Sequence, residues 1–242
     1  MPLSEAIARW RKPAVRARRH ARATRWQQPI ASAADRRAAW ASLMLADHGV
    51  LRLLYRNRHR VTDRLWRSAQ PSPGDIAWAA RAGIATVLSV RAEGFGGDPL
   101  EREACRRQGL AFERLVLQSR AAPTREALTV AIALMPRLAT PVLVHCKSGA
   151  DRAGLATALW LIVVEGRTVA EAKRQLALRY GHVRRARTGI LDAFLDDYAA
   201  TGEARGIAFA DWVRTVYDRQ ALKARFRSSR AADALLAVLN RE

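Results

Sequence analysis

The sequence predicts an α/β fold: a mostly parallel central sheet of four to five strands with helices on both faces, plus helical N- and C-terminal extensions. From residue 61 onward, short apolar segments alternate with amphipathic segments, as strands and helices do in such folds. The amphipathic segments begin at capping residues, and several end at a glycine. The chain has 242 residues, 50% of them hydrophobic, which is enough to bury a sizeable core and excludes a disordered or fibrous protein.

Four apolar segments predict the strands, and they cover 64–69, 84–90, 111–117 and 141–145. The segment 84–90 is rich in β-branched residues, which favours a buried strand. Because helices separate the strands, successive strands are expected to run in the same direction. Parallel sheets bind ligands at the carboxyl ends of their strands, so a site is expected at that edge.

The first predicted helix after residue 61 has a complete set of boundary signals. Ser72 is a candidate N-cap, Pro73 follows at the first helical position, and Asp75 completes a capping box. Gly83 ends this helix. Similar signals predict helices over 98–109, 123–138, 152–165 and 168–181, one that includes 190–198, and amphipathic helix within 201–242.

These elements divide the chain into a basic, arginine-rich helical arm over 1–48, a central domain over 49–200 and a helical extension over 201–242. The net charge is +20, and residues 1–60 hold fourteen basic residues against three acidic ones. Such a segment fits contact with an anionic membrane or another polyanion. The alternative, which we favour, is that its Trp10, Trp26 and Trp40 pack on the central domain. No specific nucleic acid is predicted as a partner.

The two cysteines, Cys105 and Cys146, are too few for a disulfide framework, and no cysteine and histidine cluster has zinc-ligand spacing. Apolar stretches such as 155–164 are shorter than the ~18 residues that a membrane span needs. We therefore expect a cytoplasmic protein, with peripheral contact to a membrane left open by the basic arm. No metal and no cofactor are expected.

One loop, between the predicted strand 141–145 and the helix after it, carries a nucleophile. It reads His145-Cys146-Lys147-Ser148-Gly149-Ala150-Asp151-Arg152. The N-terminus of a helix favours the thiolate, which is the nucleophilic form of a cysteine. The backbone amides of 147–152 and the guanidinium of Arg152 fit the oxygens of a phosphate, and Gly149 gives the tight loop its backbone freedom. We expect His145 to support Cys146 by hydrogen bonding to the loop.

At these residues the chain resembles the cysteine-dependent protein tyrosine and dual-specificity phosphatase superfamily, whose signature is His-Cys-x5-Arg between a strand and a helix. The segments 64–72 and 87–93 are similar to the opening of atypical dual-specificity phosphatases of fungi and plants and of their bacterial relatives. The resemblance covers about 60–200 and makes 49–200 the phosphatase domain. It implies that Cys146 forms a phosphocysteine, that Arg152 clamps the phosphate, and that the substrate is a phosphorylated protein or a small phosphomonoester.

Two departures from the family pattern bear on turnover. The family usually takes its general acid from an aspartate about thirty residues before the cysteine, and the segment after the strand 111–117 has no carboxylate there. Asp98 lies further upstream, but its place before Pro99 favours a helix cap. Ala153 stands where the family has the serine or threonine that assists departure of the thiolate, so breakdown of the phosphoenzyme is expected to be slow.

Asp151 is our preferred general acid, because myotubularins and Sac-domain phosphatases, which it resembles here, have an aspartate immediately before the arginine. The alternative is an Asp151 that turns outward and pairs with a neighbouring arginine or caps the helix. Lys147 also resembles loops that act on phosphoinositides. A phosphoinositide, inositol-phosphate or phospholipid substrate is therefore a second hypothesis, and a pseudophosphatase that binds phosphate without turnover is a third. Rhodanese-like sulfur transfer fits less well, because that loop usually has one residue fewer.

Overall fold

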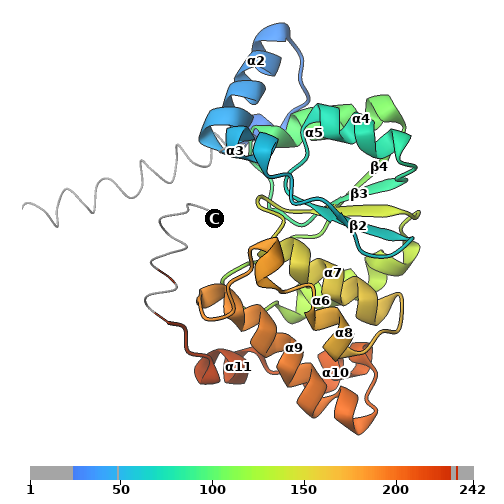
Figure 1. Cartoon of the computed structure of the whole chain (residues 1–242), viewed down its shortest axis with the longest axis vertical. Helices are drawn as coiled ribbons and strands as arrows, with labels where there is room; N and C mark the ends of the chain where they lie inside the picture. The colour runs from blue at the N-terminus through green and yellow to red at the C-terminus, as the bar shows by residue number, and fades with distance from the viewer. Residues whose placement is uncertain (1–23, 48, 230–232, 234–242) are drawn as a thin grey trace, which may run out of the picture.

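Five strands form one sheet in the computed structural model, which describes residues 24–47, 49–229 and 233 (Figure 1). Their order across the sheet is β1-β2-β5-β3-β4, and only β1 runs antiparallel to its neighbour. The strands are β1 (His59–Arg60), β2 (Leu65–Ser68), β3 (Thr86–Ser89), β4 (Ala111–Arg114) and β5 (Val142–His145). The predicted α/β fold with a mostly parallel sheet is confirmed. The sequence analysis missed β1, because two exposed polar residues carry no apolar pattern.

Helices cover both faces of the sheet (Figure 1). On one face lie α4 (Pro73–Arg81) and α5 (Gly97–Gln108), and α2 (Ala33–Ala41) packs against α5. The arm continues through a short π-helix, η1 (Ser42–Ala46), into α3 (Gly49–Leu54). The other face carries α6 (Arg125–Leu134), α7 (Asp151–Val163), α8 (Val169–Lys173), α9 (Ile190–Thr201), α10 (Phe209–Thr215) and α11 (Arg219–Arg225). Short 3-10 turns are η2 (Met135–Arg137), η3 (Leu178–Tyr180), η4 (Arg187–Gly189) and η5 (Glu203–Arg205).

Local capping explains where several helices begin. The Ser72 hydroxyl accepts a hydrogen bond from the Asp75 amide, and the Asp75 carboxylate accepts one from the Ser72 amide, which confirms the predicted capping box. Thr168 and Glu171 form a second box at α8. The boundary signals in the sequence are therefore used as predicted at these two helices.

Two helix predictions are wrong in detail. The helix predicted over 168–181 ends at Lys173. The buried Arg67 guanidinium donates a hydrogen bond of 2.6 Å to the Gln175 carbonyl oxygen, which a longer helix would need for its own backbone hydrogen bonds. At α5 the N-cap is Gly96 instead of Asp98. The Asp98 carboxylate accepts from the amides of Gly94 and Phe95 and so fixes the loop before the helix.

The main core lies between the sheet and the helices of the face that carries α6 to α11. Leu65, Val142 and Val144 of the sheet pack in it with α7, along which ten of thirteen residues are buried. Further along, Phe194 and Trp212 bring α9 and α10 into the same core. A helix buried on nearly all sides is held rigidly. The N-terminal end of α7, where the candidate loop ends, therefore has a fixed position.

The described part of the basic arm packs against α5. Trp26 and Leu43 form a small apolar cluster with Leu100, and the Arg36 guanidinium donates to both carboxylate oxygens of Glu103 at 2.6 and 2.7 Å. This matches the packing interpretation for Trp26, while Trp10 lies outside the described residues. The division between 48 and 49 stays a prediction. Within the described residues, no helix is long and apolar enough to cross a membrane.

Candidate active site

The loop 146–150 joins β5 to α7 at the carboxyl edge of the parallel strands, and its carbonyl oxygens are tied to the surrounding protein. Each of four consecutive carbonyls accepts a hydrogen bond from outside the loop: Lys147 from the Gln70 amide (3.1 Å), Ser148 from Asn57 Nδ2 (2.9 Å), and Gly149 and Ala150 from Arg67 Nη2 (2.7 and 3.1 Å). Carbonyls held outward leave the amides free to converge inward. Converging amides are an anion-binding arrangement.

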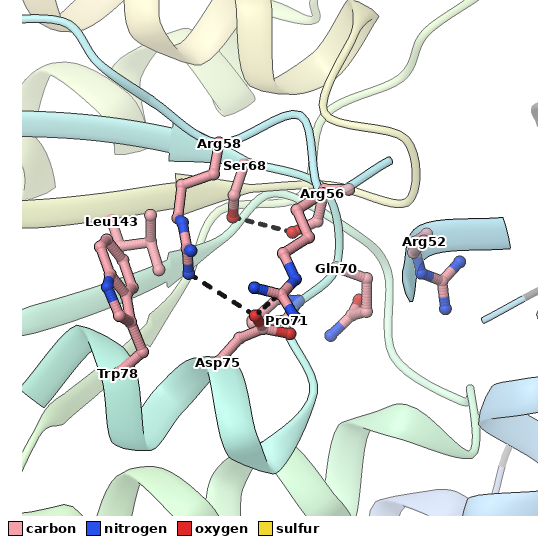
Figure 2. Close-up of a pocket in the computed structure, with 10 residues that line it drawn as sticks. Arg52, Arg56, Arg58, Ser68, Gln70, Pro71, Asp75, Trp78 and Leu143 are labelled. Atoms are coloured by element: carbon pink, nitrogen blue, oxygen red, sulfur yellow. Dashed lines mark hydrogen bonds and ion pairs between the residues drawn. The ribbon is translucent and has the colours of Figure 1, made fainter. Parts of the chain in front are cut away.

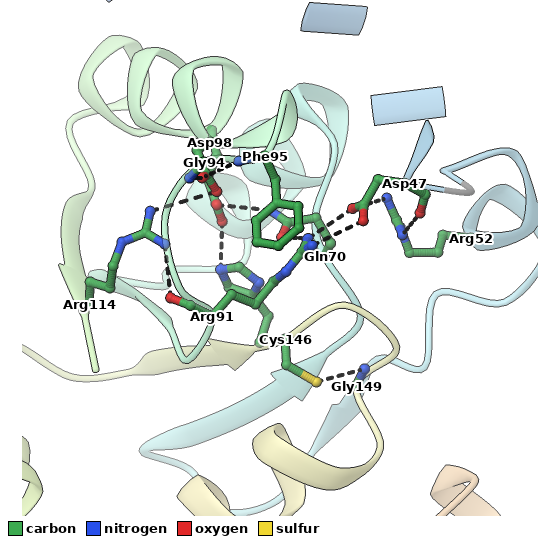
Figure 3. A network of polar contacts seen from close by, with 12 residues as sticks. Asp47, Arg52, Gln70, Arg91, Gly94, Phe95, Asp98, Arg114, Cys146 and Gly149 are labelled. Atoms are coloured by element: carbon green, nitrogen blue, oxygen red, sulfur yellow. Dashed lines mark hydrogen bonds and ion pairs between the residues drawn. The ribbon is translucent and has the colours of Figure 1, made fainter. Parts of the chain in front are cut away.

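Gly149 is required by the shape of this loop. Its φ is +75°, in the left-handed region, and a Cβ there would lie 2.7 Å from the Ala69 amide nitrogen. The backbone therefore passes directly against the end of β2. In this position the Gly149 amide donates to Cys146 Sγ at 3.2 Å (Figure 3).

Cys146 lies at the base of the loop and is 1% exposed. Its negative form would be stabilised by the Gly149 amide and by the N-terminus of α7. Three arginines from other elements, Arg52, Arg67 and Arg91, also interact favourably with a Cys146 thiolate. Burial lowers the pKa of Arg67 to about 10, so its guanidinium stays charged at neutral pH. A backbone N–H donor and three guanidinium groups thus surround the sulfur.

Arg152 occupies the first turn of α7, directly after the loop. Its Nε is buried and has no hydrogen-bond partner among the described residues. A buried donor without a partner is costly in a folded protein. A phosphate oxygen bound in the loop would satisfy it, and a guanidinium can bind two such oxygens at once.

Asp151 forms part of a buried charged triad. Its Oδ1 lies 2.6 Å from His182 Nδ1, and His182 Nε2 lies 2.6 Å from Asp192 Oδ2. Desolvation opposes the charge on His182, but its two hydrogen bonds and the two negative charges prevail and raise its pKa from 6.5 to about 9. The side chain that pairs with Asp151 is therefore a protonated histidine. It ties the catalytic loop to α9.

Asp98, the other candidate acid, is fully buried on α5. Burial raises its pKa, against the effect of Arg114, whose Nη2 lies 3.7 Å from Asp98 Oδ1. Its other oxygen is occupied by the Gly94 and Phe95 amides (Figure 3). Asp98 thus organises the β3–α5 loop, and its carboxyl group is closed to solvent.

His145, predicted to support Cys146, is also fully buried. Its Nε2 lies 2.6 Å from Glu101 Oε1 of α5, and its backbone carbonyl accepts from the Val90 amide. His145 is therefore held by α5, which lies on the face of the sheet opposite to α7.

A narrow pocket lies behind the loop, between β2 and α4 (Figure 2). Arg56, Arg58 and Trp78 line it together with Asp75, whose Oδ1 lies 3.5 Å from a guanidinium nitrogen of each of the two arginines. Its volume is about 10 Å³, which is the space of one water molecule at most. It is a packing gap and does not accommodate a substrate.

The sequence analysis missed four residues that shape the site: Asn57, Arg67, Gln70 and His182. Asn57 and Arg67 hold loop carbonyls with their side chains and Gln70 with its backbone N–H, across 77 to 91 residues of sequence. Such contacts leave no periodic pattern. Within the described residues, no group of three or more His, Cys, Asp or Glu side chains is placed to hold a metal ion.

Comparison with known proteins gives the family. A family model described as "DSP-PTPase phosphatase fused to NAD+ Kinase" matches residues 55–189. Among solved structures, P. aeruginosa TpbA, in complex with pTyr, is 22% identical with a TM-score of 0.47, and the match covers 69% of this chain and 91% of that chain. The core catalytic domain of the PP-IP phosphatase SIW14 from S. cerevisiae is 16% identical with a TM-score of 0.46, over 62% of this chain and 92% of that chain.

None of the curated proteins compared with this chain matches it in sequence. The family match covers more than half of the chain and includes the whole loop from Cys146 to Arg152. The chain therefore belongs to the DSP-PTPase family, and it is a cysteine-dependent phosphatase of the protein tyrosine and dual-specificity type.

Proposed function

We propose that the protein hydrolyses phosphomonoesters through a phosphocysteine on Cys146. The thiolate attacks phosphorus, the P–O bond to the leaving group breaks, and an S–P bond forms. Water then attacks the phosphocysteine, which releases inorganic phosphate and restores the thiolate. The observation that carries this proposal is the loop itself: four carbonyls tied outward and the Gly149 amide on the sulfur.

The amides of 147–152 and the Arg152 guanidinium would hold the three non-bridging phosphoryl oxygens. Charge on these oxygens dominates the transition state, so donors fixed in advance supply most of the stabilisation. Lys147 and Ser148 are the partly exposed members of the loop and lie where the rest of a substrate would contact it. Gly149 and Ala150 contribute backbone only.

Asp151 is proposed as the group that protonates the leaving oxygen. Its Oδ1 is held by His182, which fixes the carboxyl group beside Arg152. In the resting triad the proton lies on His182 Nδ1; as the leaving group departs, a proton passes from His182 to the Asp151 carboxylate and from Asp151 to the leaving oxygen, and the later attack of water returns a proton to the pair. Asp98 is closed to solvent and serves as the alternative only if the β3–α5 loop opens.

The substrate class is proposed as a phosphorylated tyrosine, serine or threonine side chain in a protein, or a small phosphomonoester. Phosphoinositides, inositol phosphates and phospholipid phosphates are the second candidate, since Lys147 adds a cation at the partly exposed side of the loop. Turnover of a phosphotyrosine peptide, compared with inositol phosphates and phosphatidylglycerophosphate, separates the two.

Hydrolysis of an aryl phosphate by wild type, Cys146→Ser and Asp151→Asn, with vanadate as inhibitor, tests the mechanism. Cys146→Ser should abolish turnover. Asp151→Asn should slow it most for poor leaving groups, which need a proton. An inactive wild type would overturn the proposal of turnover, and an unchanged Asp151→Asn rate would remove Asp151 as the acid.

We propose that the protein is cytoplasmic and that its arm makes a peripheral contact with an anionic membrane or another polyanion. Residues 1–23 carry seven basic residues and one acidic residue, and they precede the part of the arm that packs on α5. Deletion of 1–23 should weaken binding to anionic liposomes and leave aryl phosphate hydrolysis unchanged. Equal liposome binding by the shortened protein would contradict this role.

A further inference from the structure

A buried chain of polar contacts links the N-terminal arm to the histidine beside the nucleophile (Figure 3). Asp47, after η1, accepts two hydrogen bonds from Arg91 at 2.8 and 3.0 Å. Arg91 also donates to Gln70 Oε1 (2.8 Å), and Gln70 Nε2 donates to Glu101 Oε2 (2.8 Å). Glu101 Oε1 lies 2.6 Å from His145 Nε2. Five side chains from five segments of the chain thus form one continuous path.

The members of this path are removed from water. Their exposed fractions run from 0% for His145 to 5% for Asp47. Hydrogen bonds that involve a charged group are strong at such low exposure, and removing one partner leaves the other buried and unpaired. A change at one end of the path is therefore expected to move the groups at the other end.

Two members also touch the catalytic loop or its nucleophile. The backbone N–H of Gln70, whose side chain belongs to the path, donates to the Lys147 carbonyl at 3.1 Å, and Arg91 interacts favourably with a Cys146 thiolate. Asp47 also forms an ion pair with Arg52, whose Nη2 lies 3.2 Å from Asp47 Oδ2. The carboxylate of Asp47 therefore fixes two guanidiniums that both act on the sulfur.

The arm is seated so that Asp47 reaches this position. A Cβ on Gly96 would lie 2.3 Å from Ser42 Cβ, and one on Gly97 would lie 2.9 Å from Leu43 Cδ1. The two glycines let η1 approach the start of α5 more closely than side chains would permit. This close fit of η1 against the start of α5 brings Asp47 to Arg91, whereas the bond from Arg36 to Glu103 joins α2 to the body of α5.

We propose that Asp47 is a positioning residue for catalysis, supplied by the docked part of the arm, residues 24–47. It fixes Arg91, and through Gln70 and Glu101 it fixes the catalytic loop and His145. The inference rests on the proposed function of this loop. A loop that loses this support is expected to hold the transition state about 10- to 100-fold less well, since small misplacements of catalytic groups cost that much.

The test compares Asp47→Asn and Gln70→Met, which interrupt the path at two points, with Glu103→Gln, which weakens arm docking outside the path. We expect both path variants to lose about 10- to 100-fold in kcat on an aryl phosphate with KM changed less than threefold. The double variant should be little worse than either one, because the two changes break the same path. Glu103→Gln should lower Tm and keep kcat within twofold.

Vanadate affinity, measured by calorimetry, is a readout that does not depend on turnover and so separates this inference from the proposed function. Replacing Asp47 by asparagine removes a negative charge near an anion site, so electrostatics alone would tighten vanadate binding. The positioning role predicts that Asp47→Asn and Gln70→Met both weaken it by about 10-fold or more. Unchanged or tighter binding in folded variants, or kcat values equal to wild type below Tm, would overturn the inference. If Asp47→Asn fails to fold, Gln70→Met decides alone.

Discussion

The buried triad around His182 predicts a specific dependence of stability on pH. His182 bridges Asp151 and Asp192 with two contacts of 2.6 Å, and its pKa is raised from 6.5 to about 9. At about 1.4 kcal/mol for each tenfold change in proton affinity, this corresponds to roughly 3 kcal/mol of folding free energy. The side chain is fully buried, so solvent screening does not reduce this value greatly.

The sign follows from proton uptake. Between pH 6.5 and 9 the folded state holds the His182 proton and the unfolded state releases it, so stability falls as pH rises. The contribution is fully present below pH 6.5 and is lost as pH rises through about 9. Urea denaturation of wild type and His182→Gln at a series of pH values from about 6 to about 10 measures it, since glutamine carries no titrating proton.

The difference between the two proteins removes the titrations that they share. We expect wild type to be more stable than His182→Gln at pH 6, and the difference to shrink by roughly 3 kcal/mol by pH 10. The variant leaves two buried carboxylates without their cation, so it should be destabilised at neutral pH. A difference that stays constant over this pH range would refute the charged triad.

Three further substitutions test other parts of the structure. Gly149→Ala should lower kcat by about 100-fold or more, because its Cβ would meet the end of β2 at 2.7 Å, and a crystal structure with an unmoved loop and normal kcat would contradict this. Arg67→Met removes three hydrogen bonds to backbone carbonyls, so urea denaturation should show a loss of about 3 kcal/mol or more, with kcat also reduced; wild-type stability would refute its role in holding the loop. Ser72→Ala removes a capping box far from the sulfur, so it should cost about 1 kcal/mol and leave kcat unchanged, and a fall in kcat would link α4 to catalysis.

The catalytic loop could be predicted from the sequence because its chemistry is contiguous. The strand before Cys146, the helix after Arg152 and the glycine between them are each marked by local signals, and the structure places them as a strand, a helix and a left-handed turn. The same holds for the capping box at Ser72. Local physical chemistry decides these features, so neighbouring residues suffice to predict them.

The supports of the site could not be predicted in this way. Asn57 reaches the loop across 91 residues, and Arg67 reaches it across 82 and 83, in each case by hydrogen bonds from a side chain to the backbone. Asp47 looked like one acid in a basic arm, and only packing on α5 shows that it pairs with Arg91. The partner of Asp151 is His182, which lies 31 residues later, directly after the helix predicted over 168–181. Long-range contacts of this kind depend on the fold.

The phosphocysteine on Cys146 is the central claim, and rapid-quench mass spectrometry of the enzyme during aryl phosphate turnover tests it most directly. Because Ala153 replaces the residue that assists departure of the thiolate, the intermediate should accumulate. We predict one phosphoryl group on the peptide that contains Cys146, with a matching burst of phenol. The adduct should persist in Cys105→Ser, since Cys105 is buried on α5, and disappear in Cys146→Ser. Turnover by Cys146→Ser, or wild-type hydrolysis with neither burst nor adduct, would contradict the account.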